Sequence, residues 1–342
     1  MAASEATPLT AWQQAAKAYF YVTVWMTISM SVILFNKYIL AYSGFKYPIA
    51  LTMWHMVFCT AVSAILVRGT GTTKRLHMPR KEYVNRVVPI GALYAASLWL
   101  SNSAYLHLSV SFIQMTKALM PGLVYACGVA FGMEKLTKVT TFNMLIIAVG
   151  VAIAAYGEID FVMIGVIEQL SALVFEALRL MLVQVLITKQ GYGMNPIQSL
   201  YYVSPACAAC LALPFAFVEL PEIMNDFGLV IDYPMLVLNA LTAFALNLAV
   251  FLLIGKTSAL TMNIAGVIKD WMLIFASQHM FGNTVTFLNY LGYVVAFLAV
   301  GMYNYNKLKS AKKKEAVTRA EVQTKGGGIS GAEAGVKANG SK

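Results

Sequence analysis

The sequence predicts an all-α integral membrane protein with ten transmembrane helices, arranged as two inverted five-helix repeats. Hydrophobic residues make up 59% of the 342 residues and charged residues only 12%, whereas soluble domains carry about 25% charged residues. Ten apolar runs are long enough to cross a bilayer. Two lysines lie inside the fourth and the ninth of these runs, at equivalent places in the two halves of the chain, as in carriers built from inverted repeats.

Each predicted span is an apolar run of the length that a membrane helix needs, which is about 20 residues. The runs cover residues 18–40, 48–67, 87–107, 110–131, 139–156, 161–187, 199–218, 234–254, 258–280 and 285–305. Several connections are very short, namely 107–109, 158–160 and 255–257. Helices that are joined so closely must be antiparallel neighbours, so the runs predict an up-and-down bundle.

The connections between the runs fall into two chemical sets. One side carries the basic residues Arg68, Lys74, Arg75, Arg80, Lys81, Arg86, Lys135, Lys138, Lys189, Lys307, Lys309, Lys312, Lys313 and Lys314. The other side carries Glu158, Asp160, Glu219, Glu222, Asp226 and Asp232, with Lys46 as its one basic residue. Because basic connections stay in the cytoplasm, we expect both termini to be cytoplasmic, which requires an even number of spans.

We therefore divide the chain into four segments. Residues 1–17 are a cytoplasmic N-terminus, 18–156 the first repeat, 161–306 the second repeat, and 307–342 a basic tail whose Gly-, Ala-, Lys- and Ser-rich composition predicts disorder. The N-terminus has neither a signal-peptide layout nor a Ser- and Arg-rich transit segment. We expect the protein in the Golgi or endoplasmic reticulum membrane, with the first span as its own insertion signal.

The two intramembrane lysines are the strongest functional signal. Lys117 and Lys269 lie 152 residues apart, each near the middle of the fourth span of its half. Halves with an odd number of spans insert in opposite orientations, so both amines lie near the bilayer midplane. A charge there costs about 2.5–3.5 kcal/mol. Lysine binds phosphate as a point charge, so a substrate with a phosphate or diphosphate group would supply the missing negative charge.

Other charged residues in or near the spans are candidates for structural or gating roles. Glu176 and Arg179 are three residues apart and can pair on one helix face. Asp270 points about 100° away from Lys269 around the helix, so we expect it to reach another helix or the substrate rather than its neighbour. Asn36 and Lys37 end the first span, where Lys37 could extend to the head groups.

Several uncharged polar residues complete the candidate site. Thr116, Gln114 and Asn263 lie in apolar helices, where they either bond across helices or meet substrate hydroxyls. Aromatic residues such as Tyr105 either form core and interface belts or stack on a base of the substrate. Pro121 follows Lys117 by about one turn, so we expect a kink in the fourth span at the site.

The composition also excludes several classes of protein. No P-loop and no zinc-ligand spacing is present, the four histidines are scattered, and Cys207 and Cys210 lie in an apolar run. We therefore predict no enzymatic activity, no cofactor and no metal. The net charge of +10 does not indicate nucleic acid, because the basic residues lie in connections and the tail. The expected partners are a phosphorylated small molecule and membrane lipid, and a homodimer is an open alternative.

Four segments resemble a known family. They are Phe-Asn-Lys-Tyr-Ile-Leu at 35–40, Lys-Ala-Leu-Met-Pro at 117–121, Ala-Leu-Arg-Leu at 177–180, and the long segment 255–270, which contains Lys256 and Lys269. Together they resemble the triose-phosphate translocator and nucleotide-sugar transporter family of the drug/metabolite transporter superfamily. The resemblance implies ten helices in two inverted halves, alternating access and strict antiport.

The resemblance also implies roles for individual residues. Lys117 and Lys269 match the lysines that grip the phosphate in plastid translocators, while Asp270 stands where those proteins have an arginine. This departure removes a bidentate phosphate ligand and adds an acceptor. It is typical of a plant and algal Lys-Asp group, whose members are similar to UDP-arabinofuranose transporters of the Golgi and to probable sugar phosphate/phosphate translocators. Lys256 is a further structural or gating candidate.

Three functions follow as hypotheses. The first is a secondary-active antiporter that exchanges a nucleotide sugar, with UDP as the expected nucleotide, for the nucleoside monophosphate. The second is an exchanger of sugar phosphate or phosphoenolpyruvate for phosphate. The third is a membrane subunit of glycan synthesis without transport activity. Transport into vesicles distinguishes the three hypotheses. The first predicts stimulation by internal nucleoside monophosphate, the second predicts stimulation by internal phosphate, and the third predicts no flux.

Overall fold

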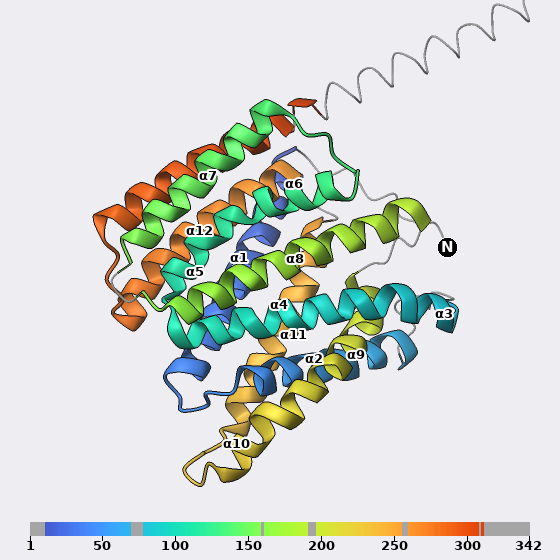
Figure 1. Cartoon of the computed structure of the whole chain (residues 1–342). Helices are drawn as coiled ribbons and strands as arrows, with labels where there is room; N and C mark the ends of the chain where they lie inside the picture. The colour runs from blue at the N-terminus through green and yellow to red at the C-terminus, as the bar shows by residue number, and fades with distance from the viewer. Residues whose placement is uncertain are drawn as a thin grey trace, which may run out of the picture.

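The computed structural model describes residues 11–69, 78–158, 161–190, 196–254, 259–307 and 309–310. Side chains are not described for 11–18, 185–190, 196, 250–254 and 259–264. Within the described residues all regular structure is helical, in agreement with the all-α prediction. The helices run roughly side by side across the molecule (Figure 1).

The first half of the chain forms seven labelled α-helical segments, some of them joined end to end. They are α1 (Ala11–Ala41), α2 (Pro48–Ala64), α3 (Arg80–Glu82), α4 (Val88–His107), α5 (Val110–Thr116), α6 (Met120–Ala130) and α7 (Lys138–Tyr156). π-helical turns extend α2 over Ile65–Gly69 and join α3 to α4 over Tyr83–Val87. A 3-10 turn over Lys117–Leu119 joins α5 to α6.

The second half follows the same pattern of long helices. Its segments are α8 (Met163–Gln190), α9 (Pro196–Pro214), α10 (Leu220–Asn225), α11 (Tyr233–Ile254), α12 (Ala259–Phe281) and a last, unlabelled helix (Phe287–Lys307). Among the described residues, five helical stretches are long and apolar enough to cross a membrane: Tyr19–Ala41, Pro48–Gly69, Lys138–Tyr156, Ile197–Asn225 and Phe287–Lys307. The chain is therefore built to pass the bilayer several times, while the count of ten spans stays a prediction.

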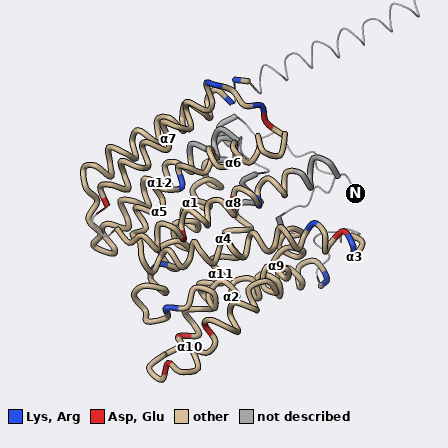
Figure 2. Tube along the Cα trace, in the orientation of Figure 1, with Lys and Arg blue, Asp and Glu red and all other residues tan. Residues whose placement is uncertain are grey.

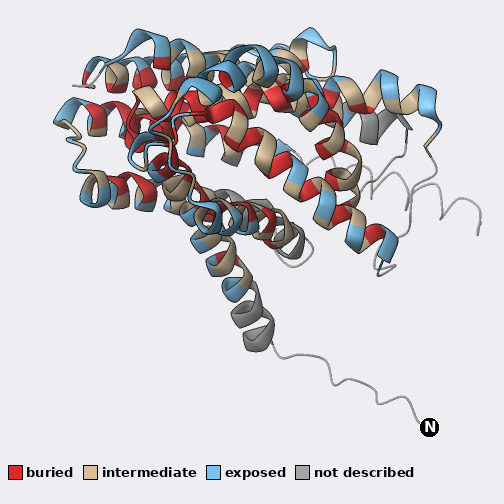
Figure 3. Ribbon diagram, turned by 90° about the horizontal axis from the view of Figure 1, so that it is seen from below, coloured by how far each residue is buried: buried red, intermediate tan, exposed pale blue. Residues whose placement is uncertain are grey.

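Helices from the two halves pack against each other rather than forming separate bodies. α4 packs against α8 and α1 against α11, while α2 lies along α9 and α5 along α12 (Figure 1). In the expected inverted repeat, α1 corresponds to α8 and α4 corresponds to α11. The contact between α4 and α8 therefore corresponds to the contact between α11 and α1. Buried residues follow the inward faces of the helices, and exposed residues the outside of the bundle (Figure 3).

One end of the bundle is closed by polar contacts between the halves. The carboxylate of Glu219, which is 4% exposed, accepts hydrogen bonds from the backbone N–H groups of Ile49 and Ala50 at 2.7 and 2.6 Å. It thus satisfies free donors in the first turn of α2, where the helix dipole favours a negative charge. Nearby, Tyr47 donates to Asp226 at 2.8 Å, and burial together with this bond raises the pKa of Tyr47 to about 12.

α7 and the last helix approach each other closely at two glycines. A Cβ atom added at Gly150 would lie 2.6 Å from the backbone nitrogen of Ala296 and 2.8 Å from the carbonyl oxygen of Gly292. A Cβ atom at Gly292 would meet the backbone of α7 as closely in return. Small residues at such a contact allow two membrane helices to pack backbone to backbone.

We therefore expect Gly150→Ala to destabilise the protein. The added methyl group meets backbone atoms that cannot rotate away, so the two helices must separate, at a cost of about 1–3 kcal/mol. Gly301→Ala in the last helix is the matched control, because nothing lies within 4 Å of a Cβ at Gly301. Thermal unfolding in detergent should show a lower Tm for Gly150→Ala alone. Equal Tm values for the two variants would contradict the packing described here.

Candidate functional site

Lys117 lies at an interruption of its helix. α5 ends at Thr116, the 3-10 turn Lys117–Leu119 follows, and α6 begins at Met120 with Pro121 in its first turn. Proline has no N–H to donate, so the hydrogen bonding of the α-helix cannot continue through it. The predicted irregularity at Pro121 is therefore present, in the form of a tighter turn that begins at the lysine itself.

Two other helices bring charges near the Lys117 ammonium. It interacts electrostatically with Lys269 and Asp270 from α12 and with Glu176 from α8. Most charged residues lie toward the ends of the helices, and only a few lie at mid-length (Figure 2). The two lysines that are far apart in the sequence thus share one electrostatic environment inside the bundle.

Lys269 is paired with its own neighbour, contrary to the prediction from the helical wheel. Its Nζ atom lies 3.0 Å from Oδ1 of Asp270, and the two side chains are 12% and 26% exposed. The prediction was wrong because a wheel gives only the direction of the Cα–Cβ bond. The four methylene groups of lysine are long enough to carry the ammonium back across 100° of helix surface.

Glu176 and Arg179 form the ion pair that their spacing predicts. The guanidinium makes two contacts with the carboxylate, one of them from Nε to Oε2 at 2.9 Å. Ser97 of α4 also donates to this carboxylate, at 3.2 Å. The Arg179 guanidinium lies 4.6 Å from the centre of the Tyr94 ring, a favourable cation–π geometry. The pair is thus anchored to α4 from both ends.

The charges of this site do not cancel. Lys117, Lys269 and Arg179 provide three cations, whereas Asp270 and Glu176 provide two carboxylates. Both carboxylates are already paired with the other two cations. Among the described residues, the excess positive charge therefore belongs to Lys117, whose Nζ atom makes a long contact of 3.5 Å to Oε1 of Gln114.

The uncharged candidates from the sequence differ in their availability. Gln114 is 1% exposed, and its Nε2 atom has no hydrogen-bond partner within the described part of the chain. Thr116 uses its hydroxyl to donate to the backbone oxygen of Ile113 at 2.8 Å. Tyr105 is a core residue of a large apolar cluster, which favours the structural alternative for this aromatic. The Asn263 side chain and Lys256 lie outside the described residues.

Lys37 does not extend to the head groups, so that alternative was wrong. The residue is 6% exposed, and its ammonium donates to the backbone oxygens of Tyr105 and Leu108 at 2.6 and 3.0 Å. These carbonyls belong to the end of α4, where the last oxygens have no partner within the helix and the dipole favours a cation. Lys37 is therefore a structural link between α1 and α4.

Asn36 belongs to a buried polar network that joins four helices. Its amide nitrogen donates to Asn102 of α4 at 3.3 Å, and its amide oxygen accepts from Asn239 of α11 at 2.9 Å. Asn239 also contacts His55 of α2, and Asn102 donates to Thr52 of α2 at 2.8 Å. Each polar side chain thereby finds the partners that burial requires, and α1, α2, α4 and α11 are held together at this level.

Two polar residues of the bundle interior were not singled out from the sequence. The Ser97 hydroxyl donates to Glu176. In the sequence, Ser97 stands out only as a hydroxyl residue within an apolar run. Gln169 of α8 is 1% exposed, and neither atom of its amide has a hydrogen-bond partner among the described residues. Its spacing of seven residues from Glu176 places both on the same helix face, a signal that the sequence did offer.

Comparisons with known proteins place the chain among membrane transporters. The profile of the Triose-phosphate Transporter family matches residues 16–304. Two proteins of Arabidopsis thaliana, each named a probable sugar phosphate/phosphate translocator, are 51% identical over 306 residues and 52% identical over 300 residues. The first alignment covers 89% of this chain and 87% of the relative, and the second 87% and 86%.

A solved structure shares the fold as well. It is described only as the crystal structure of a protein, and it aligns with a TM-score of 0.50 at 16% sequence identity. The alignment covers 86% of this chain and 98% of that one.

Proposed function

Because the chain belongs to the Triose-phosphate Transporter family, we propose that it exchanges a sugar phosphate for inorganic phosphate across its membrane. It is a multi-pass membrane transporter and not an enzyme. The names of its Arabidopsis thaliana relatives favour a sugar phosphate over the nucleotide sugar that we ranked first from the sequence.

The observation that carries this proposal is the excess positive charge at Lys117. No carboxylate among the described residues forms an ion pair with Lys117. A cation inside the bundle needs an anion, and a phosphate group supplies it. The phosphate also binds the Lys269 ammonium, because the charges of Lys117 and Lys269 interact with each other. Asp270 then gives up its contact with Lys269 and accepts a hydrogen bond from a hydroxyl of the sugar.

The remaining groups serve this exchange in different ways. Glu176 and Arg179 neutralise each other, so they hold α8 in place without competing for the substrate. Gln114 and Gln169 offer amide donors and acceptors to the sugar hydroxyls. Asn36 and its network close one end of the path, since four helices must separate there before the substrate can pass.

Alternating access follows from a ten-span arrangement in two inverted repeats, 18–156 and 161–306. The pairing of helices supports it, because exchanging the halves converts the α1–α11 contact into the α4–α8 contact. In such carriers the two repeats rock around a fixed site at the midplane. Both termini then lie in the cytoplasm, together with the basic connections, and the proposed compartment is the Golgi or endoplasmic reticulum membrane.

Counter-exchange in reconstituted vesicles tests the proposal. Vesicles that contain the purified protein are preloaded with inorganic phosphate, with UMP, or with neither, and the uptake of radioactive phosphate and of a labelled sugar phosphate is measured. We expect uptake of both only into phosphate-loaded vesicles. Uptake of a labelled UDP-sugar into UMP-loaded vesicles, without uptake of phosphate into phosphate-loaded ones, would restore the nucleotide-sugar function, and equal uptake into all three preparations would contradict exchange.

A further inference from the structure

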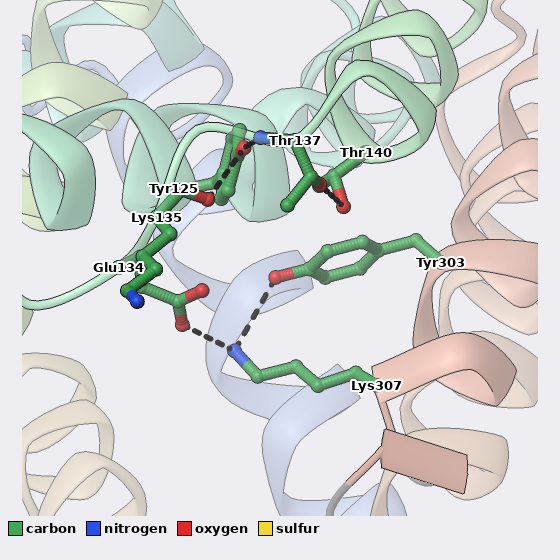
Figure 4. Close-up of polar contacts among 7 residues, drawn as sticks. All are labelled: Tyr125, Glu134, Lys135, Thr137, Thr140, Tyr303 and Lys307. Atoms are coloured by element: carbon green, nitrogen blue, oxygen red, sulfur yellow. Dashed lines mark hydrogen bonds and ion pairs between the residues drawn. The ribbon is translucent and has the colours of Figure 1, made fainter.

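A cavity lies where the connection between α6 and α7 meets the last helix (Figure 4). Its volume is about 590 Å³, and it is lined by lysines, hydroxyl groups and an amide, among them Lys135, Lys307, Thr140, Tyr303 and Asn306. Its lining comes from the ends of helices, whereas Lys117 lies between α5 and α6 and Lys269 lies within α12.

The connection that forms one wall is held in a fixed shape. The hydroxyl of Tyr125 accepts from the backbone N–H of Thr137 at 2.9 Å and donates to the backbone oxygen of Lys135 at 3.2 Å (Figure 4). Thr137 in turn donates through its hydroxyl to Thr140 at 2.8 Å. The turn that carries Lys135 therefore does not need to be ordered when a ligand binds, which lowers the entropic cost of binding.

The cavity and one hollow beside it are basic. Lys135, Lys307 and Lys309 contribute three cations to their lining, and Glu134 contributes one carboxylate. The Glu134 carboxylate lies 3.5 Å from the Lys307 ammonium, with the side chains 42% and 55% exposed. An exposed ion pair of this kind stabilises little, so an anion with a higher charge can replace the carboxylate.

An apolar groove continues from the basic cavity along α7. This hollow of about 320 Å³ is lined by Val139, Phe142, Ile146 and Met302. Val139 and Phe142 are 71% and 66% exposed, so this face of α7 lies open in the absence of lipid. A ligand that fills both spaces must carry an anionic head and an apolar tail.

Asn143 lies at the junction of the groove and the neighbouring basic hollow. The residue is 5% exposed, and its amide nitrogen donates to the backbone oxygen of Ala299 at 3.1 Å. Its amide oxygen has no hydrogen-bond partner among the described residues.

We propose that this region is a binding site for an anionic glycerophospholipid. The phosphate binds Lys135, Lys307 and Lys309, and an acyl chain lies in the groove along α7. Lysines at a membrane surface attract anionic lipid in this way, and the basic end of the bundle faces the leaflet that is rich in such lipids. A free phosphate ion would leave the groove unused, so we commit to the lipid.

Native mass spectrometry of the purified full chain tests this site with phosphatidylinositol as the probe. The variant Lys135→Gln/Lys309→Gln removes one cation from the cavity and one from the hollow beside it. The control variant Lys46→Gln/Lys81→Gln removes two exposed cations elsewhere on the protein. Each lysine near an anionic lipid contributes about fivefold in affinity, so we expect the cavity variant to bind the lipid about 25-fold more weakly and the control to bind it as the unmodified chain does.

Soluble glycerophosphoinositol provides the second arm. It carries the same phosphate and hydroxyl groups but no acyl chain, so it should not displace the lipid at equal concentration. Equal weakening of the two variants would overturn the proposal in favour of general attraction between the protein and anionic lipid. Full displacement by the soluble head group would overturn it in favour of a site for soluble phosphates.

Discussion

Lys117→Met should lower phosphate exchange in vesicles by at least about 100-fold. The ammonium carries the excess positive charge of the site, and methionine keeps much of its length without the charge. A phosphate dianion would then enter an enclosed site with one cation fewer, and an unpaired buried charge costs about 3–5 kcal/mol. Each 1.4 kcal/mol corresponds to a factor of ten.

Two controls accompany this variant. Lys81→Met removes a lysine that is exposed on α3 and should leave exchange unchanged. Lys117→Arg keeps the charge in a larger group and should retain part of the exchange. The Tm of Lys117→Met should not fall, because the variant removes an uncompensated charge from the interior. If Lys117→Met folds normally and exchanges phosphate as fast as the unmodified chain, Lys117 is not part of the binding site.

A pair of variants at Lys269 and Asp270 should separate transport from structure. Lys269→Ala alone is expected to lower exchange by about 100-fold, because it removes a phosphate ligand and leaves the Asp270 carboxylate without its partner at 3.0 Å. Asp270→Asn alone frees the lysine, so it should tighten phosphate binding while weakening the discrimination between sugar phosphates, which the carboxylate provides through a hydroxyl contact.

The double variant Lys269→Ala/Asp270→Asn decides between two roles for Lys269. If the lysine only neutralises Asp270, removing both charges should restore exchange. If it binds phosphate, the double variant should stay as inactive as Lys269→Ala while recovering its Tm. We expect the second outcome. Restored exchange in the double variant would assign Lys269 a structural role and leave Lys117 as the phosphate ligand.

The features that could be predicted from the sequence are those that depend on nearby residues. Pro121 predicts the interrupted helix at Lys117, and the spacing of Glu176 and Arg179 predicts their ion pair, because both follow from the geometry of a single helix. The apolar runs predict long helices for the same reason, and the described helices lie within or close to those runs.

The features that could not be predicted depend on contacts between helices or on the reach of a side chain. Lys37 binds the carbonyls at the end of α4, and nothing in its own run shows that these oxygens lie within reach. Ser97 finds Glu176 across 79 residues of sequence. The Lys269–Asp270 pair is local, yet a helical wheel does not predict it, because the wheel shows only the direction of the Cα–Cβ bond and not the reach of a flexible lysine.

The most direct test of the central claim is equilibrium binding of radioactive phosphate to the purified protein in detergent. We predict one saturable phosphate site that is displaced by a sugar phosphate, and at least tenfold weaker binding to Lys117→Met with no change for Lys81→Met. Phosphate binding to Lys117→Met with the affinity of the unmodified chain would contradict the claim that this lysine holds the transported anion.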